Sequence, residues 1–597
     1  MSTPVHSPRH AATSAVWVEP TRLASAWRAC KVLAHVVLRS AKNWFHGPTR
    51  ISPSGRAAEA PIVAEYRSAL WLDGREDEFV LRCGKVQNLR VAVRHFDGIE
   101  VLSGQVLSFW SQLGRPVKSK GYAVGREIVN GCVVPIVGGG LCQLSNALAE
   151  VAAIAGIRFV EHHRHSALIE QQRKSDSVDA TVAWNYIDLR LQADFDFTVE
   201  VQLTQDELVI RVRSATAPSM LRRHQITQGA KEETKPTARG CLTCDQTACF
   251  RNRRYAAQPA ARTAFLLNER SPELAVWLQE RAGSDDWFLP WVRHRRRHLG
   301  WSAPERAQVS VALLPAWKRV LRQRLTRGEG GVRQAGRLRA AADLAKHYAD
   351  RLRPEHINLV LSQELLVPLW RAGALGGRSY DVFVSELPAS EVQARLDAAA
   401  RVNPGTASLR DFRVDADWQK DEWAALAAAR TVLSSHSEIQ RVLERAGLKV
   451  ECLPWCRPAL SRGHSRRNSQ SPTMVFPASA LPRKGALEVA EVARRLAMRV
   501  LILGTSPSDA EAWAGVNWSV VPYSSDWLSE ADVVVLPAYI EHQPRAALQA
   551  ITAGVPVVAS SACGLTQLPG VQEVEAGDLH AIERAVTQAL TSVRAQA

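Results

Sequence analysis

The sequence predicts an α/β protein whose C-terminal part forms two doubly wound parallel-sheet halves and whose N-terminal part is an α+β domain. The clearest observation is a strand, helix and strand in succession: the apolar run Asp532–Pro537, a helix from about Arg545 to Ala553, and a buried strand at Val555–Ala559 after Gly554. Continuously apolar strands are typical of parallel sheets covered on both faces. The same alternation recurs through the second half of the chain, and 597 residues exceed what one core holds.

Changes in composition divide the chain into five segments. The stretch 461–472 is polar and without apolar periodicity, which predicts a hinge between the two C-terminal halves. The leader has apolar residues at near-helical spacing around Leu23–Leu38, and we expect a helix that either packs on the next domain or touches a membrane surface. The predicted segments are a leader at 1–60, an α+β domain at 82–214, a cysteine-containing linker at 215–262, and parallel-sheet halves at 263–460 and 473–597.

The net charge is +16, and basic residues are concentrated between Arg293 and Arg327. Such a field suits phosphates, anionic lipid or nucleic acid, but no nucleic-acid-binding motif accompanies it, so no nucleic acid is expected. No apolar run approaches about 18 residues, and no secretory signal is evident. We therefore expect a cytoplasmic chain, with peripheral contact at the inner membrane surface as the alternative.

In the α+β domain, the glycine-rich motif Gly138–Ser145 lies between a predicted strand at Val133–Val137 and a helix that runs to about Ala155. Asn130–Gly131 signals a hairpin, and further strands are predicted at Asp179–Tyr186, Phe197–Leu203 and Leu208–Val212. This segment resembles the VanW family closely. The residues that carry the resemblance are Val129–Gly131, Gly138–Ser145, His165–Ser166 and Asp179–Val182.

Cys142 is the first candidate for chemistry. It follows a glycine turn at the expected start of a helix, where unpaired N–H groups favour a thiolate. With His165 as base and Asp179 as orienting carboxylate, it would suit a thiol acyl hydrolase or transferase. In the alternative interpretation Cys142 packs under the turn, His165 bonds a backbone carbonyl and Asp179 caps a turn.

The linker contains Cys241, Cys244 and Cys249. Their spacing can supply three corners of a tetrahedral zinc site, for which His224 is the nearest upstream candidate for a fourth ligand. Free or redox-active thiols in a linker are the alternative.

Glu541 lies where the second half is expected to bind an anion, because the helix that begins near Arg545 directs its first N–H groups toward the crevice at the strand ends. Residues Glu541–Ser560 resemble the donor-binding signature of retaining GT-B glycosyltransferases of family 4. That resemblance implies that Glu541 contacts the donor sugar. The family's second glutamate would stand at position 549, where this chain has Gln549, which can still bond ribose hydroxyls.

The loop Pro482–Gly485 resembles the lysine-glycine loop of the same enzymes, in which the lysine meets the donor diphosphate. Lys484 would therefore neutralise the leaving phosphates. The family's arginine five residues earlier is Ser479 here, so that charge is missing unless Arg483 or Arg545 replaces it.

In the first half, residues 422–437 resemble the end of the acceptor half of GT-B enzymes, whereas the glycine-rich loop near its first strand is absent. Residues 308–327 form an amphipathic basic stretch, expected to be helical after Pro315. We interpret it as a core helix with a solvated basic face, and contact with an anionic membrane is the alternative.

Together these patterns predict a GT-B-like protein that transfers a sugar from a nucleotide-sugar donor to an envelope or polysaccharide acceptor. By resemblance it would be retaining and metal-independent, apart from a structural zinc in the linker. The alternatives are a thiol-dependent acyl hydrolase or transferase centred on Cys142, and a non-catalytic sensor of sugar nucleotides or envelope precursors.

Overall fold

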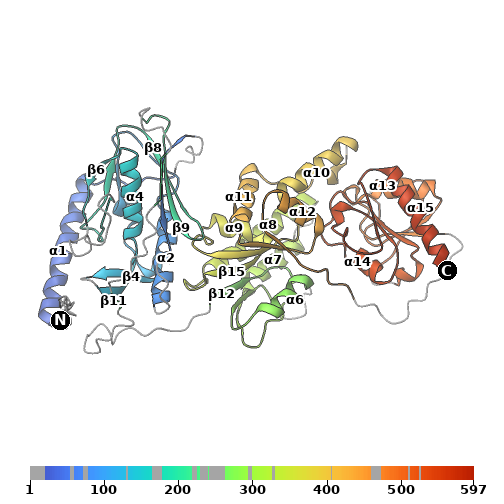
Figure 1. Ribbon diagram of the computed structural model, residues 1–597, viewed down its shortest axis with the longest axis horizontal. Helices are drawn as coiled ribbons and strands as arrows, with labels where there is room; N and C mark the ends of the chain where they lie inside the picture. The colour runs from blue at the N-terminus through green and yellow to red at the C-terminus, as the bar shows by residue number, and fades with distance from the viewer. Residues whose placement is uncertain are drawn as a thin grey trace, which may run out of the picture. The chain divides into compact units, whose positions relative to one another are not determined.

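The computed structural model of the chain describes residues 21–53, 60–71, 78–129, 132–164, 178–217, 225–228, 239–240, 262–292, 299–325, 330–404, 406–458, 472–507, 511–523 and 526–596. These form two compact units (Figure 1). Unit 1 runs to Arg262 and includes the short segments Arg353–Ile357 and Gly376–Arg378, and unit 2 holds the rest from Thr263 onward. The predicted hinge at 461–472 lies outside the described residues except for Pro472.

Unit 1 contains a five-stranded sheet of order β10-β1-β9-β8-β2. Strand β1, which lies between β10 and β9, was not expected from the sequence, because Glu65 and Arg67 interrupt its apolar run. Glu65 is nevertheless buried, and ion pairs to Arg67 and Arg211 at 2.7 and 2.6 Å compensate its charge. The strands are β1 (Ile62–Ala69), β2 (Ile99–Val101), β8 (Phe197–Leu203), β9 (Glu207–Arg213) and β10 (Gln225–Gln228), and helix α2 (Phe79–Val93) follows β1.

The predicted hairpin is confirmed, since β4 (Val124–Val129) pairs antiparallel with β5 (Cys132–Val137). The predicted helix is also present as α4 (Cys142–Ile154). The prediction of a strand at 179–186 is wrong. The backbone of Ala180 instead forms hydrogen bonds with the side chains of Ser145 and Asn146 of α4, and the described segment has only an isolated bridge, between Ala183 and Ile187. The remaining elements are α1 (Arg22–His46), β3 (Val106–Ser108), α3 (Phe109–Leu113), β6 (Arg158–Glu161), β7 (Arg190–Gln192) and β11 (Arg239–Gly240).

The first half of unit 2 is a seven-stranded parallel sheet of order β14-β13-β12-β15-β16-β17-β18. Alternate residues of the strands belong to two hydrophobic clusters, one on each face of the sheet, as a doubly wound sheet requires. The strands are β12 (Thr263–Leu266), β13 (Asp286–Leu289), β14 (Gln308–Val311), β15 (Asn358–Ser362), β16 (Ser379–Phe383), β17 (Thr431–Ser434) and β18 (Val450–Cys452). The helices are α6 (Pro272–Arg281), α7 (Leu313–Leu325), α8 (Gly330–Ala349), α9 (Leu366–Arg371), α10 (Ala389–Val402), α11 (Ala416–Ala427) and α12 (Ser437–Arg445).

The second half is a six-stranded parallel sheet of order β21-β20-β19-β22-β23-β24 with its own hydrophobic cluster. Gly554 ends α14 with φ +76°, as expected for a helix stop. The predicted fold class, an α+β region followed by a GT-B-like pair of parallel-sheet halves, is confirmed by this topology. The elements are β19 (Thr473–Phe476), α13 (Ala486–Arg495), β20 (Arg499–Ile502), β21 (Asn517–Val520), β22 (Val533–Leu536), α14 (Arg545–Thr552), β23 (Val557–Ser560), β24 (Val571–Val574) and α15 (Leu579–Gln596).

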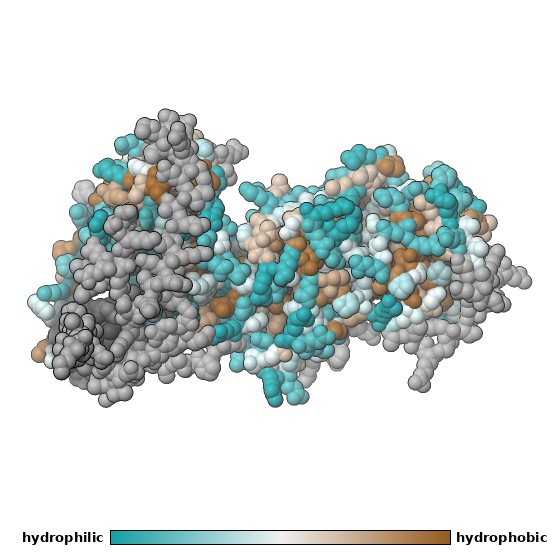
Figure 2. Space-filling model, viewed as in Figure 1, coloured by the Kyte–Doolittle hydropathy of each residue, from teal (hydrophilic) through white to brown (hydrophobic). Residues whose placement is uncertain are grey.

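Helix α7 differs from its interpretation as a core helix with a solvated basic face. Leu314 and Trp317 are 66% and 63% exposed, whereas Arg319 is 8% exposed. The Arg319 guanidinium donates to the Asn268 side chain at 2.9 Å and also pairs with Glu269, so burial of this arginine is compensated. On the side of the molecule that Figure 2 shows, hydrophilic residues are mixed with small hydrophobic patches. None of the described helices is both long and apolar enough to cross a membrane.

Candidate functional site

The centre of the candidate site lies at the carboxyl ends of β19 and β22. The loop after β19 carries Lys484 and the loop after β22 carries Glu541, 57 residues later. Lys484 Nζ donates to Glu541 Oε2 at 2.9 Å and to the Ile540 carbonyl oxygen at 3.0 Å. The parallel sheet thus brings together the two residues that the sequence assigned to the donor site.

Gly485 allows the two loops to approach this closely. It adopts φ +83°, and a Cβ atom there would lie 2.4 Å from the carbonyl oxygen of Pro537. The carbonyl of Arg483 accepts hydrogen bonds from the N–H groups of Tyr539 and Ile540 at 3.1 and 3.4 Å. The position of Lys484 is therefore fixed by backbone contacts on both sides of it.

The charge of Glu541 is stabilised by this arrangement. Burial raises the pKa of its carboxyl group, but the charge and hydrogen bond of Lys484 and a hydrogen bond from the Gln543 N–H group outweigh that effect. The pKa of Glu541 consequently lies below its ordinary value. A carboxylate and an ammonium group, both partly exposed, face the crevice at the strand ends.

Arg545 and Arg483 both carry charge near the site but are engaged elsewhere. Arg545 forms a two-pronged ion pair with Glu273 of α6, at 2.6 and 2.8 Å, and the Glu273 side chain is 1% exposed. Arg483 lies 3.6 Å from Asp411 and over the ring of Phe412. The replacement of the missing arginine by either residue therefore stays a prediction that requires these pairs to rearrange.

Gln549 and Ser479 occupy the two positions that depart from the family pattern. The Oε1 atom of Gln549 is buried and accepts no hydrogen bond within the described residues. Ser479 Oγ accepts a hydrogen bond from the Thr505 N–H group at 3.2 Å. Among the described residues no side chain caps the N-terminus of α14, and the Arg545 N–H group donates to the Gln543 carbonyl oxygen at 2.7 Å. Anion binding by the first N–H groups of this helix therefore stays a prediction.

Two histidines that the sequence did not assign to the site attach the Glu541 loop to the first half of unit 2. Nδ1 of His436 accepts from the Ile439 N–H group, so Nε2 carries the proton and donates to the Glu541 carbonyl oxygen at 2.8 Å. His542 Nε2 accepts from the Leu387 N–H group at 3.2 Å. Burial lowers the pKa of both rings, which keeps them neutral. The dipeptide Ser435–His436 at a strand end was the available sequence signal.

A cavity of about 130 Å³ in the first half includes Gln543 in its wall and is therefore next to the Glu541 loop. Its charged residues are mostly paired: Arg337 bonds Glu386 at 3.0 Å, and Arg319 pairs with Glu269. Burial, followed by the charges of Glu269 and Glu386, raises the pKa of Glu364 to about 7. A larger cavity of about 900 Å³ includes neither Lys484 nor Glu541 in its lining.

The raised pKa of Glu364 predicts a pH-dependent stability. Between its unfolded pKa of about 4.5 and its folded pKa of about 7, the folded chain binds the extra proton, so stability falls as pH rises through this window. Glu364→Gln is expected to remove that fall and to melt at a higher temperature than the wild type above about pH 7. Thermal unfolding of both chains across this range measures the effect, and parallel curves would contradict it.

In unit 1, Cys142 is the first residue of α4 and lines a cavity of about 720 Å³ with mostly apolar walls. Its Sγ atom lies 4.0 Å from the carbonyl oxygen of Val182. Asp179 is buried, and its carbonyl oxygen bonds Nε2 of His162 at 2.6 Å. His165 lies outside the described residues, so its grouping with Cys142 and Asp179 stays a prediction.

The zinc prediction also falls on residues that the structure does not describe, namely Cys241, Cys244 and Cys249. Across the described ranges, no group of three or more His, Cys, Asp or Glu side chains is placed to hold a metal ion.

Comparisons with solved structures give low overall scores. Sucrose-phosphate synthase from Thermosynechococcus elongatus aligns with 56% of this chain and 90% of its own, at 14% identity and a TM-score of 0.37. The catalytic domain of starch synthase IV from Arabidopsis thaliana, bound to ADP and acarbose, aligns with 56% of this chain and 92% of its own, at 11% identity and a TM-score of 0.36. Because these TM-scores are low, the assignment of the fold class rests on the sheet topology described above and not on the solved structures.

Curated relatives match unit 1. The vancomycin B-type resistance protein VanW of Enterococcus faecalis (strain ATCC 700802 / V583) is 28% identical over 149 residues, which is 24% of this chain. The uncharacterized protein YoaR of Bacillus subtilis (strain 168) is 29% identical over 109 residues, or 18% of this chain. The chain spans 54% and 35% of the length of these two proteins.

Family models match one segment in each unit. Residues 84–214 match the model described as VanW like protein, and residues 471–592 match the model described as Glycosyl transferases group 1. The second segment contains Lys484, Glu541 and Gln549. The two resemblances expected from the sequence are thus confirmed: a VanW-like segment precedes a segment similar to group 1 glycosyl transferases.

Proposed function

We propose that unit 2 transfers a sugar from a nucleotide donor to an envelope or polysaccharide acceptor. The observation that carries the proposal is the Lys484–Glu541 pair at 2.9 Å, at the carboxyl edge of a parallel sheet and in front of the N-terminus of α14. Ligands of such sheets bind at this edge. The match of residues 471–592 to the Glycosyl transferases group 1 model supports the same chemistry.

In this proposal Lys484 contacts the donor diphosphate and neutralises the charge that develops as the sugar leaves. Its present partner Glu541 is then available to bond sugar hydroxyls. The buried Oε1 of Gln549 is an acceptor without a partner in the described structure and would receive a hydrogen bond from a ribose hydroxyl. By resemblance to family 4, the transfer would be retaining and metal-independent.

Calorimetry with a panel of UDP-, GDP- and ADP-sugars tests the donor site. We expect one class of nucleotide sugar to bind, with turnover when acceptor is supplied. Binding without turnover against any acceptor tried would favour the sensor alternative. Absence of binding to every nucleotide sugar would refute both nucleotide-dependent functions.

The acceptor part of the proposal includes peripheral membrane contact through α7. Leu314 and Trp317 are largely exposed, and the helix contains Lys318, Arg322 and Arg324 but no acidic residue. An exposed apolar stripe with basic neighbours is the composition that binds anionic lipid surfaces. A lipid-linked acceptor at the inner membrane surface would be reached through this helix.

A second candidate function concerns unit 1. The observation that favours it is the position of Cys142 at the start of α4 and in the wall of the cavity of about 720 Å³. The thiol would attack an acyl carbonyl, form a thioester and release the leaving group, with His165 as base and Asp179 as its orienting partner. The apolar walls of the cavity suit an acyl group with a hydrocarbon part.

A further inference from the structure

Helix α1 of unit 1 presents two chemically different faces. One face lies against the rest of unit 1: Asn185 Nδ2 donates to Ser40 Oγ at 2.7 Å and to the Val36 carbonyl oxygen at 3.3 Å. One helical turn further, Asn43 Oδ1 accepts from Arg190 at 2.8 Å. These positions, three or four residues apart, mark a single inward stripe.

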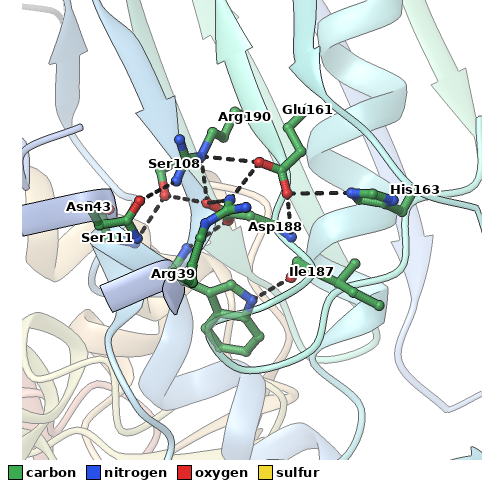
Figure 3. Close-up of polar contacts among 10 residues, drawn as sticks. Arg39, Asn43, Ser108, Ser111, Glu161, His163, Ile187, Asp188 and Arg190 are labelled. Atoms are coloured by element: carbon green, nitrogen blue, oxygen red, sulfur yellow. Dashed lines mark hydrogen bonds and ion pairs between the residues drawn. The ribbon is translucent and has the colours of Figure 1, made fainter. Parts of the chain in front are cut away.

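A cluster of charged residues holds this stripe in place (Figure 3). Arg39 pairs with Glu161 of β6 and lies 3.6 Å from Asp188, while Arg190 lies 3.0 Å from Asp188 and 3.4 Å from Glu161. Two guanidinium groups thus face two carboxylates. Asp188 also accepts from the Ser108 hydroxyl at 2.7 Å. Because the charges balance and are hydrogen-bonded, the cluster fixes the orientation of α1.

The opposite face of α1 is apolar, and its side chains in the described part of the chain are exposed. At about 100° per residue, its large apolar residues outside the inward stripe share one continuous arc of the helix. An exposed stripe of this kind marks a surface for binding. The four most exposed are Trp44 at 86%, Leu23 at 84%, Leu38 at 69% and Trp27 at 66%, and Leu33 and Val37 lie between them at 61% and 56%.

The charge of α1 indicates what covers this stripe. Apart from Arg39, whose charge the inward cluster balances, the helix contains Arg22, Arg28, Lys31 and Lys42 and no acidic residue. Lys31 lies over the Trp27 ring at the edge of the stripe. A second copy of α1 would bring like charges together, which disfavours self-association, whereas an anionic lipid surface complements them. Tryptophans near both ends suit the headgroup region of a bilayer.

We infer that α1 lies on an anionic lipid surface, with its apolar stripe at the boundary between headgroups and acyl chains and with Lys31 and Lys42 among the headgroups. The charged cluster on the inward face then keeps unit 1 attached to the helix. This inference rests on unit 1 alone and holds whether or not unit 2 transfers sugar.

Vesicle sedimentation of the full-length chain tests the inference. We expect binding to vesicles of phosphatidylcholine and phosphatidylglycerol, weaker binding to pure phosphatidylcholine, and loss of binding as salt rises. Trp27→Ser with Leu38→Ser is expected to weaken partitioning at least about tenfold, and Lys31→Glu with Lys42→Glu to do the same on anionic vesicles only.

The matched control is Leu102→Ser with Trp518→Ser, which makes the same two changes at exposed positions elsewhere and should leave binding unchanged. Because α7 also carries exposed apolar residues, each comparison is repeated in a Leu314→Ser, Trp317→Ser background. The inference is overturned if the α1 variant binds like the wild type in both backgrounds, or if the chain binds no vesicle. It is also overturned if light scattering without lipid shows a dimer that the α1 variant dissociates, since a second copy would then cover the stripe.

Discussion

Lys484→Ala is expected to lower kcat/KM for sugar transfer at least about 1000-fold, which corresponds to about 4 kcal/mol of transition-state stabilisation. The ammonium group is fixed by the backbone of its own loop and by the Ile540 carbonyl, so it is oriented before the donor binds. Its removal also leaves the partly buried Glu541 carboxylate without the charge that keeps its pKa low. The variant therefore loses the phosphate contact and alters the sugar contact together.

Two other variants are measured beside Lys484→Ala, one as a control and one to separate the two candidate functions. Lys449→Ala removes an exposed lysine from unit 2 away from the site and should retain activity. Cys142→Ala separates the two candidate functions, because it should leave sugar transfer intact and abolish any acyl transfer. If Cys142→Ala abolishes the measured activity and Lys484→Ala does not, the glycosyl-transfer proposal fails. Circular dichroism of each variant checks that the fold is retained.

The donor half was predictable because its signals are local. The apolar run of β22, the helix stop at Gly554 and the Lys484–Gly485 loop each lie within a few residues of sequence, and the parallel sheet fixes where their ends meet. The Glu273–Arg545 pair joins residues 272 positions apart, and it depends on how the two halves of unit 2 meet. Periodicity carries no information on such a pairing. The same holds for His436 and its bond to the Glu541 carbonyl.

Helix α7 shows a different limit of sequence reasoning. An amphipathic pattern identifies two faces but predicts the buried one only by assuming that apolar residues face inward. Here Asn268 and Glu269 supply partners for Arg319, so the arginine is buried and Trp317 is exposed. In β1 the buried Glu65 is compensated in the same way. In both places ion pairs decide which side chain is buried, against the order that hydropathy predicts.

Gly485→Ala is expected to destabilise unit 2 by about 3 kcal/mol and to weaken donor binding. Two costs add: alanine at φ +83° is strained by about 1 kcal/mol, and its Cβ would meet the Pro537 carbonyl oxygen at 2.4 Å and Pro537 Cγ at 2.7 Å. Relief of that contact must move the loop, and a displacement of about 1 Å at Lys484 can cost about 100-fold in rate. Urea denaturation and calorimetry with the bound nucleotide sugar measure the two effects.

Gly554→Ala separates these two costs. Gly554 has a similar conformation, φ +76°, in the same half of unit 2, but a Cβ there meets nothing within 4 Å. It therefore incurs only the strain of about 1 kcal/mol and should leave donor binding unchanged. The difference between the two variants isolates the contact with Pro537 that positions Lys484. Equal destabilisation and equal donor affinity would mean that the close approach of the two loops does not hold the lysine. The position of Lys484 would then have to come from the contacts of its ammonium group with Glu541 and the Ile540 carbonyl oxygen.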